Sequence, residues 1–468
     1  MGKRVFVALV AAVVALCTTP FTAVADDPPQ DSINCGTASG LTTCTGKFVD
    51  GAKVLIEVPG NWNGTLLLYS HGYVTPGLAL TARDVGDPGT RAYLLSAGYA
   101  LAGSSYATNG WALEQAIPDQ IHTLDVFAQR IGTPTRTIAW GHSLGGIITA
   151  GLLQTHPDRF DGALPMCGVV AGGVAVWNEG LDAQFVIKTL LAPPQSALQL
   201  VHITNPGGNF NLSEQIIFAA QQSPQGRARL ALAAAVGDLP GWFNPLSPEP
   251  APTDFSTQEV NQYNWIFNVD GPFLFALRAE LEARAGGNPS WNTGVNYGKQ
   301  LERSIDNAEV QALYTAAGLD LNADLAALAA APRISADPSA VGYLTDHIVF
   351  NGNLGGKPVL TIHTTGDGLV LNSDEQAYRS AAQDAKDSQL LRQAFVHRAG
   401  HCTFTPAETV AALQALVTRL DTGKWTSLAD PANLNAAAAA LGPLNVLPPS
   451  YIDFEPAPFL RPFDTASH

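Results

Sequence analysis

The chain has 468 residues, which is enough for one large core with an insertion or for two domains. Its composition is that of an ordinary globular protein, and its formal net charge is −15. An acidic chain is a poor partner for nucleic acid and for anionic membrane surfaces, so the charge argues against both functions.

The first 25 residues have the features of a secretory signal peptide. Two basic residues precede an apolar run over 5–16, and Ala23-Val24-Ala25 has the form of a cleavage site. The run is too short to span a bilayer, and the leucine before Cys17 does not fit a lipid-anchor signal. We therefore expect cleavage near Ala25 and a secreted, extracellular protein without a membrane anchor. Cleavage removes two basic residues and no acid, so the net charge becomes −17.

Four cysteines remain after cleavage: Cys35, Cys44, Cys167 and Cys402. An even number in an exported protein indicates two disulfides, and four cysteines allow three pairings. We favour Cys35–Cys44, which closes a small loop containing two glycines, together with Cys167–Cys402.

Strands and helices alternate along the first part of the chain. Strands are expected at 52–58, 65–70, 99–103, 137–140 and 162–170, and helices at 90–96, from Pro118, and from 144 to about 156. This alternation predicts an α/β fold with a doubly wound, mostly parallel sheet.

Residues 174–356 interrupt the alternation, with alanine-rich helical stretches, many aromatic residues and no strand pattern. It resumes with strands at 358–363 and 390–397 and a helix that begins at the capping box Thr405-Pro406-Ala407-Glu408. We therefore expect a core over 26–173 and 357–424, a mainly helical insertion over 174–356, and a Pro/Ala-rich C-terminal extension over 425–468 without a sheet of its own.

The segment Gly141-His142-Ser143-Leu144-Gly145 fits G-x-S-x-G, a strand-to-helix turn that exposes a serine. A short apolar strand precedes it and an apolar helix follows it, as this turn requires. The glycines allow strand and helix to approach closely and allow positive φ angles. The alternative is a glycine-rich turn around a buried serine.

Together with three further segments, this turn resembles the α/β-hydrolase family. The family's chain order is an oxyanion-loop His-Gly, the serine of G-x-S-x-G, an acid and a histidine. Here the order is matched by His71-Gly72-Tyr73, Ser143, Asp367 and His401. The resemblance covers the core, about residues 45–173 and 357–424, and the insertion lies where this family often carries a lid.

The resemblance implies a serine hydrolase in which Ser143 is the nucleophile, His401 the base and Asp367 the acid that orients it. Each of the three follows a predicted strand. Because the carboxyl ends of parallel strands meet at one edge of a sheet, the three side chains can come together there. The backbone N–H groups of Leu144 and Tyr73 are the expected oxyanion hole.

Rival residues exist for the base and for the acid. His397 is the rival base, but it is the last residue of its predicted strand, whereas His401 lies in the following loop, where the family carries its base. Asp374 and Glu375 are rival acids a turn further along, and we expect them on a solvated helix face. We expect His71 to hold its loop by hydrogen bonds rather than to act as a second base.

Residues His401-Cys402 are similar to one half of an arrangement in secreted tannase and feruloyl-esterase-like hydrolases. There a disulfide ties the histidine loop to a cysteine just before the serine. Here His142 precedes the serine, which departs from that arrangement, and Cys167, one strand further along, is the candidate partner of Cys402.

Metal-binding and cofactor-binding motifs do not accompany these residues. We expect no metal, no cofactor, and a small-molecule or peptide substrate cleaved at an ester bond, because esterases are the commoner enzymes of this fold, which is an analogy. The alternatives are an amidase or peptidase with the same mechanism and a non-catalytic binding protein on a hydrolase fold.

Overall fold

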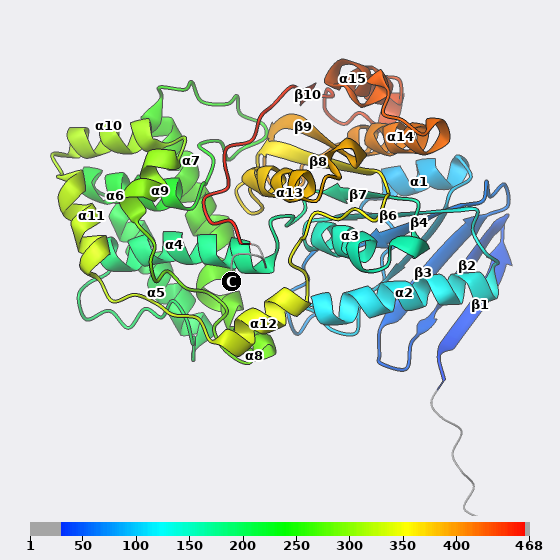
Figure 1. The fold of residues 1–468 in the computed structure, drawn as a ribbon, viewed down its shortest axis with the longest axis horizontal. Coiled ribbons are helices and arrows are strands. Elements are labelled where there is room, and N and C mark those ends of the chain that lie inside the picture. Colours follow the sequence, from blue (N-terminus) through cyan, green and yellow to red (C-terminus); the bar gives the residue numbers. More distant parts are fainter. Residues whose placement is uncertain (1–29, 464–468) are drawn as a thin grey trace, which may run out of the picture.

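The computed structural model describes residues 30–463, drawn in colour in Figure 1. The predicted signal peptide, residues 1–25, and Cys17 lie outside the described residues. Within residues 30–463, no helix is long and apolar enough to cross a membrane.

In the described part of the chain, ten strands form one sheet in the order β1-β2-β3-β5-β4-β6-β7-β8-β9-β10. Strands β5, β4, β6, β7, β8 and β9 run parallel, and the pairings at both edges are antiparallel. The strands are β1 (Ser32–Ala38), β2 (Leu41–Lys47), β3 (Lys53–Pro59), β4 (Thr65–Ser70), β5 (Ala100–Ser104), β6 (Arg136–His142), β7 (Gly162–Met166), β8 (Val359–Gly366), β9 (Leu391–Ala399) and β10 (Tyr451–Ile452). The mostly parallel, doubly wound sheet predicted from the sequence is confirmed.

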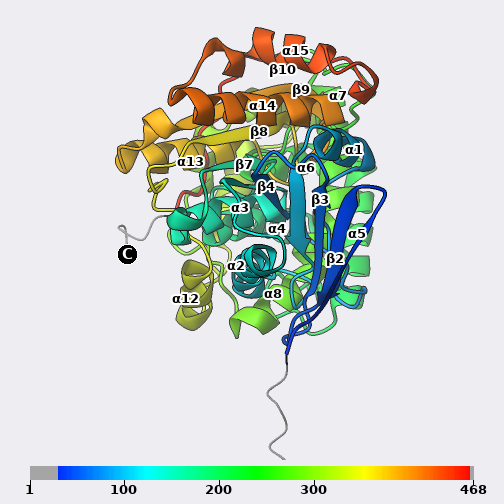
Figure 2. The same ribbon diagram turned by 90° about the vertical axis from the view of Figure 1, so that its right-hand side faces the viewer.

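Helices cover both faces of this sheet (Figure 2). One face carries α2 (Leu113–Arg130), α3 (Leu144–Thr155) and α13 (Ser373–Asp384), and the other carries α1 (Pro88–Ser96), α14 (Pro406–Thr422) and α15 (Pro431–Ala439). Side chains of a strand alternate between faces, so Leu66 and Leu68 of β4 join the cluster around α3 while Leu67 and Tyr69 join the cluster around α14. Burial on both faces explains why this strand is a continuous apolar run.

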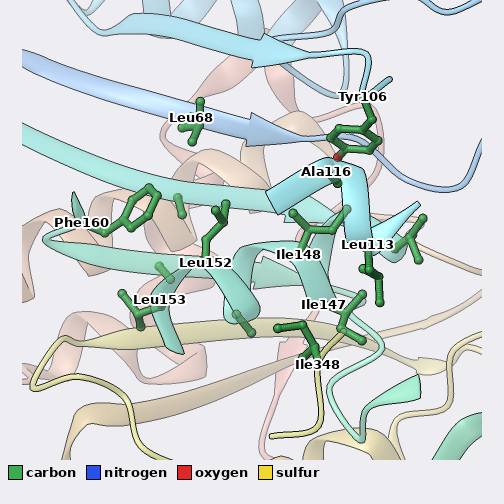
Figure 3. Close-up of a cluster of buried hydrophobic side chains, with 14 of the residues drawn as sticks. Leu68, Tyr106, Leu113, Ala116, Ile147, Ile148, Leu152, Leu153, Phe160 and Ile348 are labelled. Atoms are coloured by element: carbon green, nitrogen blue, oxygen red, sulfur yellow. The ribbon is translucent and has the colours of Figure 1, made fainter. Parts of the chain in front are cut away.

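Helix α3 follows the G-x-S-x-G turn and is almost completely buried. Every residue from Leu144 to Leu153 is buried. Figure 3 shows Ile147 and Leu152 in the same apolar cluster as Leu68 of β4 and Ile348. Burial of each such side chain contributes about 1.5–3 kcal/mol, so this helix holds the turn firmly in place.

Between β7 and β8 the described chain forms helices and no strand. They are α4 (Gly173–Leu191), α5 (Pro206–Gln221), α6 (Pro224–Val236), α7 (Phe255–Trp265), α8 (Arg278–Ala285), α9 (Tyr297–Arg303), α10 (Asn307–Ala317), α11 (Leu321–Ala330) and α12 (Pro338–Asp346). Two π-helical turns, η2 (Ile266–Asp270) and η3 (Phe273–Leu277), connect α7 to α8. These helices have an apolar core of their own and lie to one side of the sheet (Figure 1).

The C-terminal segment connects the sheet with these helices. After α15, strand β10 pairs antiparallel with β9 at the edge of the sheet. The chain then continues to the helical region (Figure 1), where Arg461 Nη1 lies 2.5 Å from Asp182 Oδ2 of α4. The segment predicted as an extension without its own sheet therefore adds a short edge strand to the main sheet and contacts the insertion.

Two local expectations differ from the structure. Pro118 does not open its helix, because α2 begins at Leu113 and Pro118 lies in its second turn. Proline removes the hydrogen bond to the carbonyl of Glu114, and since both residues are exposed, water can hydrate that carbonyl. Strand β7 ends at Met166 rather than at residue 170.

The hairpin of β1 and β2 was not predicted. Its residues are mostly exposed, so it lacks the apolar alternation by which strands are recognised. The two strands turn at Ser39-Gly40, and Cys35 and Cys44 are directly opposite each other in the pairing. Their disulfide, with a Cα–Cα distance of 4.0 Å, ties this hairpin together.

Candidate active site

Ser143 lies in the sharp turn between β6 and α3. Its backbone has φ +59° and ψ −124°, a conformation that residues with a Cβ rarely adopt. The turn requires its glycines, because a Cβ on Gly145 would lie 1.9 Å from the carbonyl oxygen of Ser70, and one on Gly141 would lie 2.4 Å from the same atom. The turn has the geometry that G-x-S-x-G predicts.

Asp367 and His401 meet at the carboxyl ends of β8 and β9. His401 Nδ1 donates a hydrogen bond of 2.8 Å to Asp367 Oδ2. Asp367 Oδ1 accepts the backbone N–H groups of Leu369 and Val370, both at 3.1 Å. The fully buried carboxylate therefore has donors on both oxygens, which fix its orientation and that of the imidazole.

His401 and Ser143 lie at the same edge of the sheet without a hydrogen bond between them among the described residues. His401 is close enough to His142, which precedes the serine, to act on it electrostatically. Burial, followed by this contribution from His401, lowers the pKa of His142 to about 4. In ligand-free hydrolases the contact between serine and base is often long and shortens when substrate binds.

A disulfide holds the loop that carries His401. Cys167 follows β7 and Cys402 follows His401, and their Cα atoms are 5.4 Å apart. The bridge spans the carboxyl end of β8, which carries Asp367. The structure thus contains both disulfides that the sequence favours.

Within residues 30–463, one group of side chains is spaced as metal ligands are: the candidate ligand atoms of Cys167, His401 and Cys402 lie within 4.8 Å of one another. Both sulfurs belong to the disulfide, so this group offers no thiolate to a metal.

The loop His71-Gly72-Tyr73 follows β4 and lies against the serine. A Cβ on Gly72 would lie only 3.8 Å from Ser143 Oγ. The buried His71 donates from Nδ1 to the carbonyl of Gly72 at 2.7 Å, and its ring stacks on Tyr106 at 4.0 Å. Burial lowers the pKa of His71, so this neutral imidazole fixes the loop.

The two expected oxyanion donors lie beside the serine. Tyr73 and Leu144 line the same cavity as Ser143. The N–H of Tyr73 donates to no acceptor among the described residues. Leu144 is the first residue of α3, where backbone N–H groups have no partner within the helix.

The rival base lies away from this arrangement. His397 is within β9, with Nε2 at 3.6 Å from the carboxylate of Glu249 and its ring against Trp242. Neither of these partners belongs to the group around Asp367.

The rival acids, Asp374 and Glu375, are both buried, so the expectation of a solvated helix face is wrong. They form the first turn of α13, which packs against the sheet. Glu375 accepts a hydrogen bond of 2.6 Å from Thr361 and lies 3.2 Å from His363 Nδ1.

His363 is a buried cation beside Asp367 that the sequence did not indicate. Its Nε2 donates to the carbonyl of Val370 at 2.9 Å and lies 3.8 Å from Asp367 Oδ2. Burial alone would lower the pKa of His363, but the carboxylates of Glu375 and Asp367 outweigh it and raise the pKa to about 9. The acid that holds His401 is therefore also next to a positive charge.

Comparison with known proteins assigns the chain to a family. It is 32% identical over 426 residues to an o-phthalyl amidase from Xanthobacter agilis, which covers 84% of this chain and 90% of that protein. The chain belongs to the same family as this amidase. Residues 98–174, which include Ser143, match the prolyl oligopeptidase family. The protein is a hydrolase of the esterase, amidase or peptidase type with the α/β-hydrolase fold.

Two solved structures are similar to this α/β-hydrolase at lower sequence identity than the amidase. An esterase from Aspergillus oryzae is 15% identical with a TM-score of 0.41, over 82% of this chain and 80% of that one. Feruloyl esterase B from Aspergillus oryzae is 16% identical with a TM-score of 0.37, over the same shares.

Two hollows of this hydrolase adjoin its candidate catalytic groups. A cavity of about 140 Å³ is lined by Ser143, Leu144 and Tyr73 together with residues of α4, η2 and η3. A separate groove is lined by His401 and by Phe243 and Trp265 of the insertion. Residues of the helical insertion therefore adjoin both Ser143 and His401.

Three acids of the cavity were not recognised as site residues from the sequence. They are Glu179 of α4, Asp270 of η2 and Asp374 of α13, of which only Asp374 was considered, as a rival acid. A detectable signal existed for Glu179, because it lies in the middle of the apolar stretch Gly173–Leu191.

Proposed function

We propose that this protein is a serine hydrolase that cleaves a carboxylic ester through an acyl-enzyme. Ser143 Oγ attacks the carbonyl carbon, and His401 accepts the hydroxyl proton and delivers it to the leaving alcohol. Asp367 orients His401 and stabilises its protonated form. Water then attacks the acyl-enzyme by the same route, releasing the acid and restoring the serine.

The 2.8 Å hydrogen bond between Asp367 and His401, at the sheet edge where Ser143 is held at φ +59°, carries this proposal. The N–H groups of Tyr73 and Leu144 are the proposed oxyanion hole. In other serine hydrolases the loss of one such donor raises the barrier by about 2.7–4 kcal/mol.

An amide substrate is the second candidate, and the relative named o-phthalyl amidase favours it. The same residues cleave an amide when His401 protonates the departing amine. Because an alcohol leaves more readily than an amine, a site that cleaves an amide also cleaves the matching ester. Ester hydrolysis is therefore the first activity to measure.

The test combines covalent labelling with matched substrates. A fluorophosphonate should modify the peptide that contains Ser143 in the wild type and leave the Ser143→Ala variant unlabelled. Aryl esters and anilides of the same acyl groups, with the o-phthalyl group among them, then rank ester against amide cleavage. A protein that binds these compounds but is neither labelled nor active would be a non-catalytic binding protein and would overturn the proposal.

We also propose that the protein is secreted after removal of residues 1–25. Its two disulfides support this location, because such bonds persist in oxidising surroundings. N-terminal sequencing of protein recovered from the medium should begin at Asp26. Recovery only from cells, with Met1 retained, contradicts this proposal.

A further inference from the structure

The two hollows at the candidate active site differ in which proposed catalytic group lines them. The 140 Å³ cavity includes Ser143, Tyr73 and Leu144, whereas His401 lines the separate groove. The base of a serine hydrolase protonates the leaving group, so the leaving group lies on the side of the base and the acyl group on the other side. If the proposed function holds, the cavity receives the acyl group.

Three buried carboxyl groups line this cavity, and each has an oxygen that receives no hydrogen bond. Glu179, Asp270 and Asp374 are 3%, 7% and 1% exposed. Each has an oxygen without a partner, namely Glu179 Oε1, Asp270 Oδ2 and Asp374 Oδ1. Among the described residues, the one hydrogen bond to any of these side chains comes from the N–H of Ala171 to Asp374 at 3.4 Å. Because buried polar groups normally have partners, these open acceptors can receive donors from a ligand. The same lining also carries donors without a partner, namely the hydroxyl of Tyr73 and the indole N–H groups of Trp111 and Trp177.

The basic groups near these acids are already paired. Arg461, which acts on Glu179, donates to Asp182 at 2.5 Å and to the carbonyl of Trp291 at 2.8 Å. His363, which acts on Asp374, has both ring nitrogens occupied. Among the described residues, the cavity lining contains no lysine and no arginine.

Burial is the largest influence on all three carboxyl groups and raises their pKa well above the usual range, and neighbouring acids raise it further. Arg461 opposes this rise in the pKa of Glu179, and His363 and the N–H of Ala171 oppose it for Asp374. These neighbours are Asp238, Asp374 and Asp182 around Glu179, Asp367 beside Asp270, and Glu375 and Asp367 around Asp374. An incoming positive charge would favour the ionised forms of these carboxyl groups.

Four aromatic residues stand among the mostly aliphatic residues of the remaining wall. Trp111 and Trp177 meet edge to face with centroids 5.7 Å apart, and Tyr73 meets Phe273 at 5.2 Å. Aromatic faces attract cations, so the rings of Trp111, Tyr73 and Phe273 favour the same ligand charge as the carboxyl groups, whereas Trp177 already has Arg278 over its ring at 5.7 Å. An anionic acyl group would find no positive partner on the lining.

We propose that this cavity selects acyl groups that end in an ammonium group, whose N–H donors bind Glu179, Asp270 and Asp374. Its volume is about that of an engineered cavity that holds benzene, which is room for a short alkyl chain. The inference rests on the proposed function, since that function assigns the acyl side.

Three esters of 4-nitrophenol with acyl chains of nearly equal length test the inference: 6-aminohexanoate, heptanoate and the adipate monoester. They present an ammonium, a methyl and a carboxylate group at the same distance from the carbonyl. We expect kcat/KM at pH 7 to be at least about tenfold higher for the 6-aminohexanoate than for the heptanoate, and lowest for the adipate. Equal values, or a preference for heptanoate or adipate, would overturn the inference.

Charge-removing variants of nearly unchanged shape locate the selectivity. In Glu179→Gln, Asp270→Asn and Asp374→Asn, the ratio of kcat/KM for 6-aminohexanoate to that for heptanoate should fall towards one. The matched control is Glu309→Gln, which changes a buried acid of the insertion that does not line the cavity. A ratio that survives in all three cavity variants, or falls equally in the control, contradicts the assignment. The wild-type comparison stands even if a variant fails to fold.

Failure of this inference is distinguishable from failure of the proposed function. If Ser143 is labelled and heptanoate is hydrolysed without preference for ammonium, only the inference fails. If Ser143 is not labelled and none of the three esters is hydrolysed above background, both fail.

Discussion

The sheet region and the insertion-facing cavity treat buried carboxyl groups differently. At the sheet edge, Asp367 has donors on both oxygens, and Glu408 is paired with Arg398 at 2.7 Å. In the cavity, Glu179 and Asp270 have oxygens that meet no donor. A hydrogen-bond network in which every group has a partner holds its side chains in one arrangement, whereas acceptors without a partner are free to bind a ligand. We propose that the residues at the sheet edge carry out the chemistry and that the cavity selects the substrate.

The largest expected effect is on the sheet side. Ser143→Ala should lower kcat by about 10⁴–10⁶ while leaving the melting temperature unchanged, because alanine fits the same turn. Steady-state kinetics and calorimetry on the same preparation check both parts. Activity of this variant within tenfold of wild type would show that Ser143 is not the nucleophile.

Substitution of His401 should have a much larger effect on kcat than substitution of His397. His401→Ala removes the base and should cost roughly 10³–10⁶ in kcat, as for other triad members. His397→Ala removes a side chain that contacts Glu249 and Trp242, and should change kcat less than about threefold. If His397→Ala is the inactive variant, the two roles are exchanged.

The two disulfides should differ in their stabilising effect. Loop-entropy arguments give up to about 5 kcal/mol for Cys167–Cys402, which closes 235 residues, and about 3 kcal/mol for Cys35–Cys44, which closes nine. Paired serine variants compared by urea unfolding measure the difference. Only loss of Cys167–Cys402 should also lower kcat, because Cys402 adjoins His401. If both pairs of serine variants lower kcat equally, the Cys167–Cys402 bridge has no special role in positioning the loop of His401.

His363 predicts a pH dependence of stability. Its pKa is raised from 6.5 to about 9 in the folded protein, so its stabilising contribution is complete below about pH 6.5 and is lost as the pH rises through about 9. The shift corresponds to about 3 kcal/mol. Urea unfolding between pH 6 and 10 should show this loss in the wild type and not in His363→Gln. The same slope in both proteins would assign it to other groups.

The smallest expected effect lies in the insertion. Phe273→Ala removes a ring from the cavity wall beside Tyr73 and so enlarges the cavity. It should change the preference among acyl chain lengths by about three- to tenfold. Fluorophosphonate labelling of Ser143 should stay within about twofold of wild type. A large loss of labelling without a change in chain preference would mean that the insertion supports the chemistry itself.

Much of the sheet side could be predicted because its signals are local. Ser143 lies between glycines whose missing Cβ atoms the turn requires, and Asp367 and His401 each follow an apolar strand by a few residues. The capping box at Thr405 and Glu408 is complete in the structure, as its spacing predicts. Once parallel strands are recognised, their carboxyl ends share an edge, so distant residues can be placed together.

The cavity could not be predicted in this way. Glu179, Asp270 and Asp374 come from an α-helix of the insertion, a π-helical turn and a helix beside the sheet. Whether these carboxyl groups face a common space depends on how the insertion packs on the core, and no sequence spacing encodes that packing. Asp374 shows the difficulty, because its place in a polar first turn favoured a solvated face, whereas tertiary packing buries it.

The contact between Arg461 and Asp182 bears on when the molecule becomes complete during its synthesis. Asp182 is translated before the second half of the chain, whereas Arg461 is among the last eight residues. Ser143, Asp367 and His401 are therefore already part of the nascent chain before Arg461 is added. Until then the chain lacks the residue that joins α4 to the C-terminal segment. Loss of Arg461 alone would leave Ser143, Asp367 and His401 in the chain and would remove the ion pair that joins α4 to the C-terminal segment.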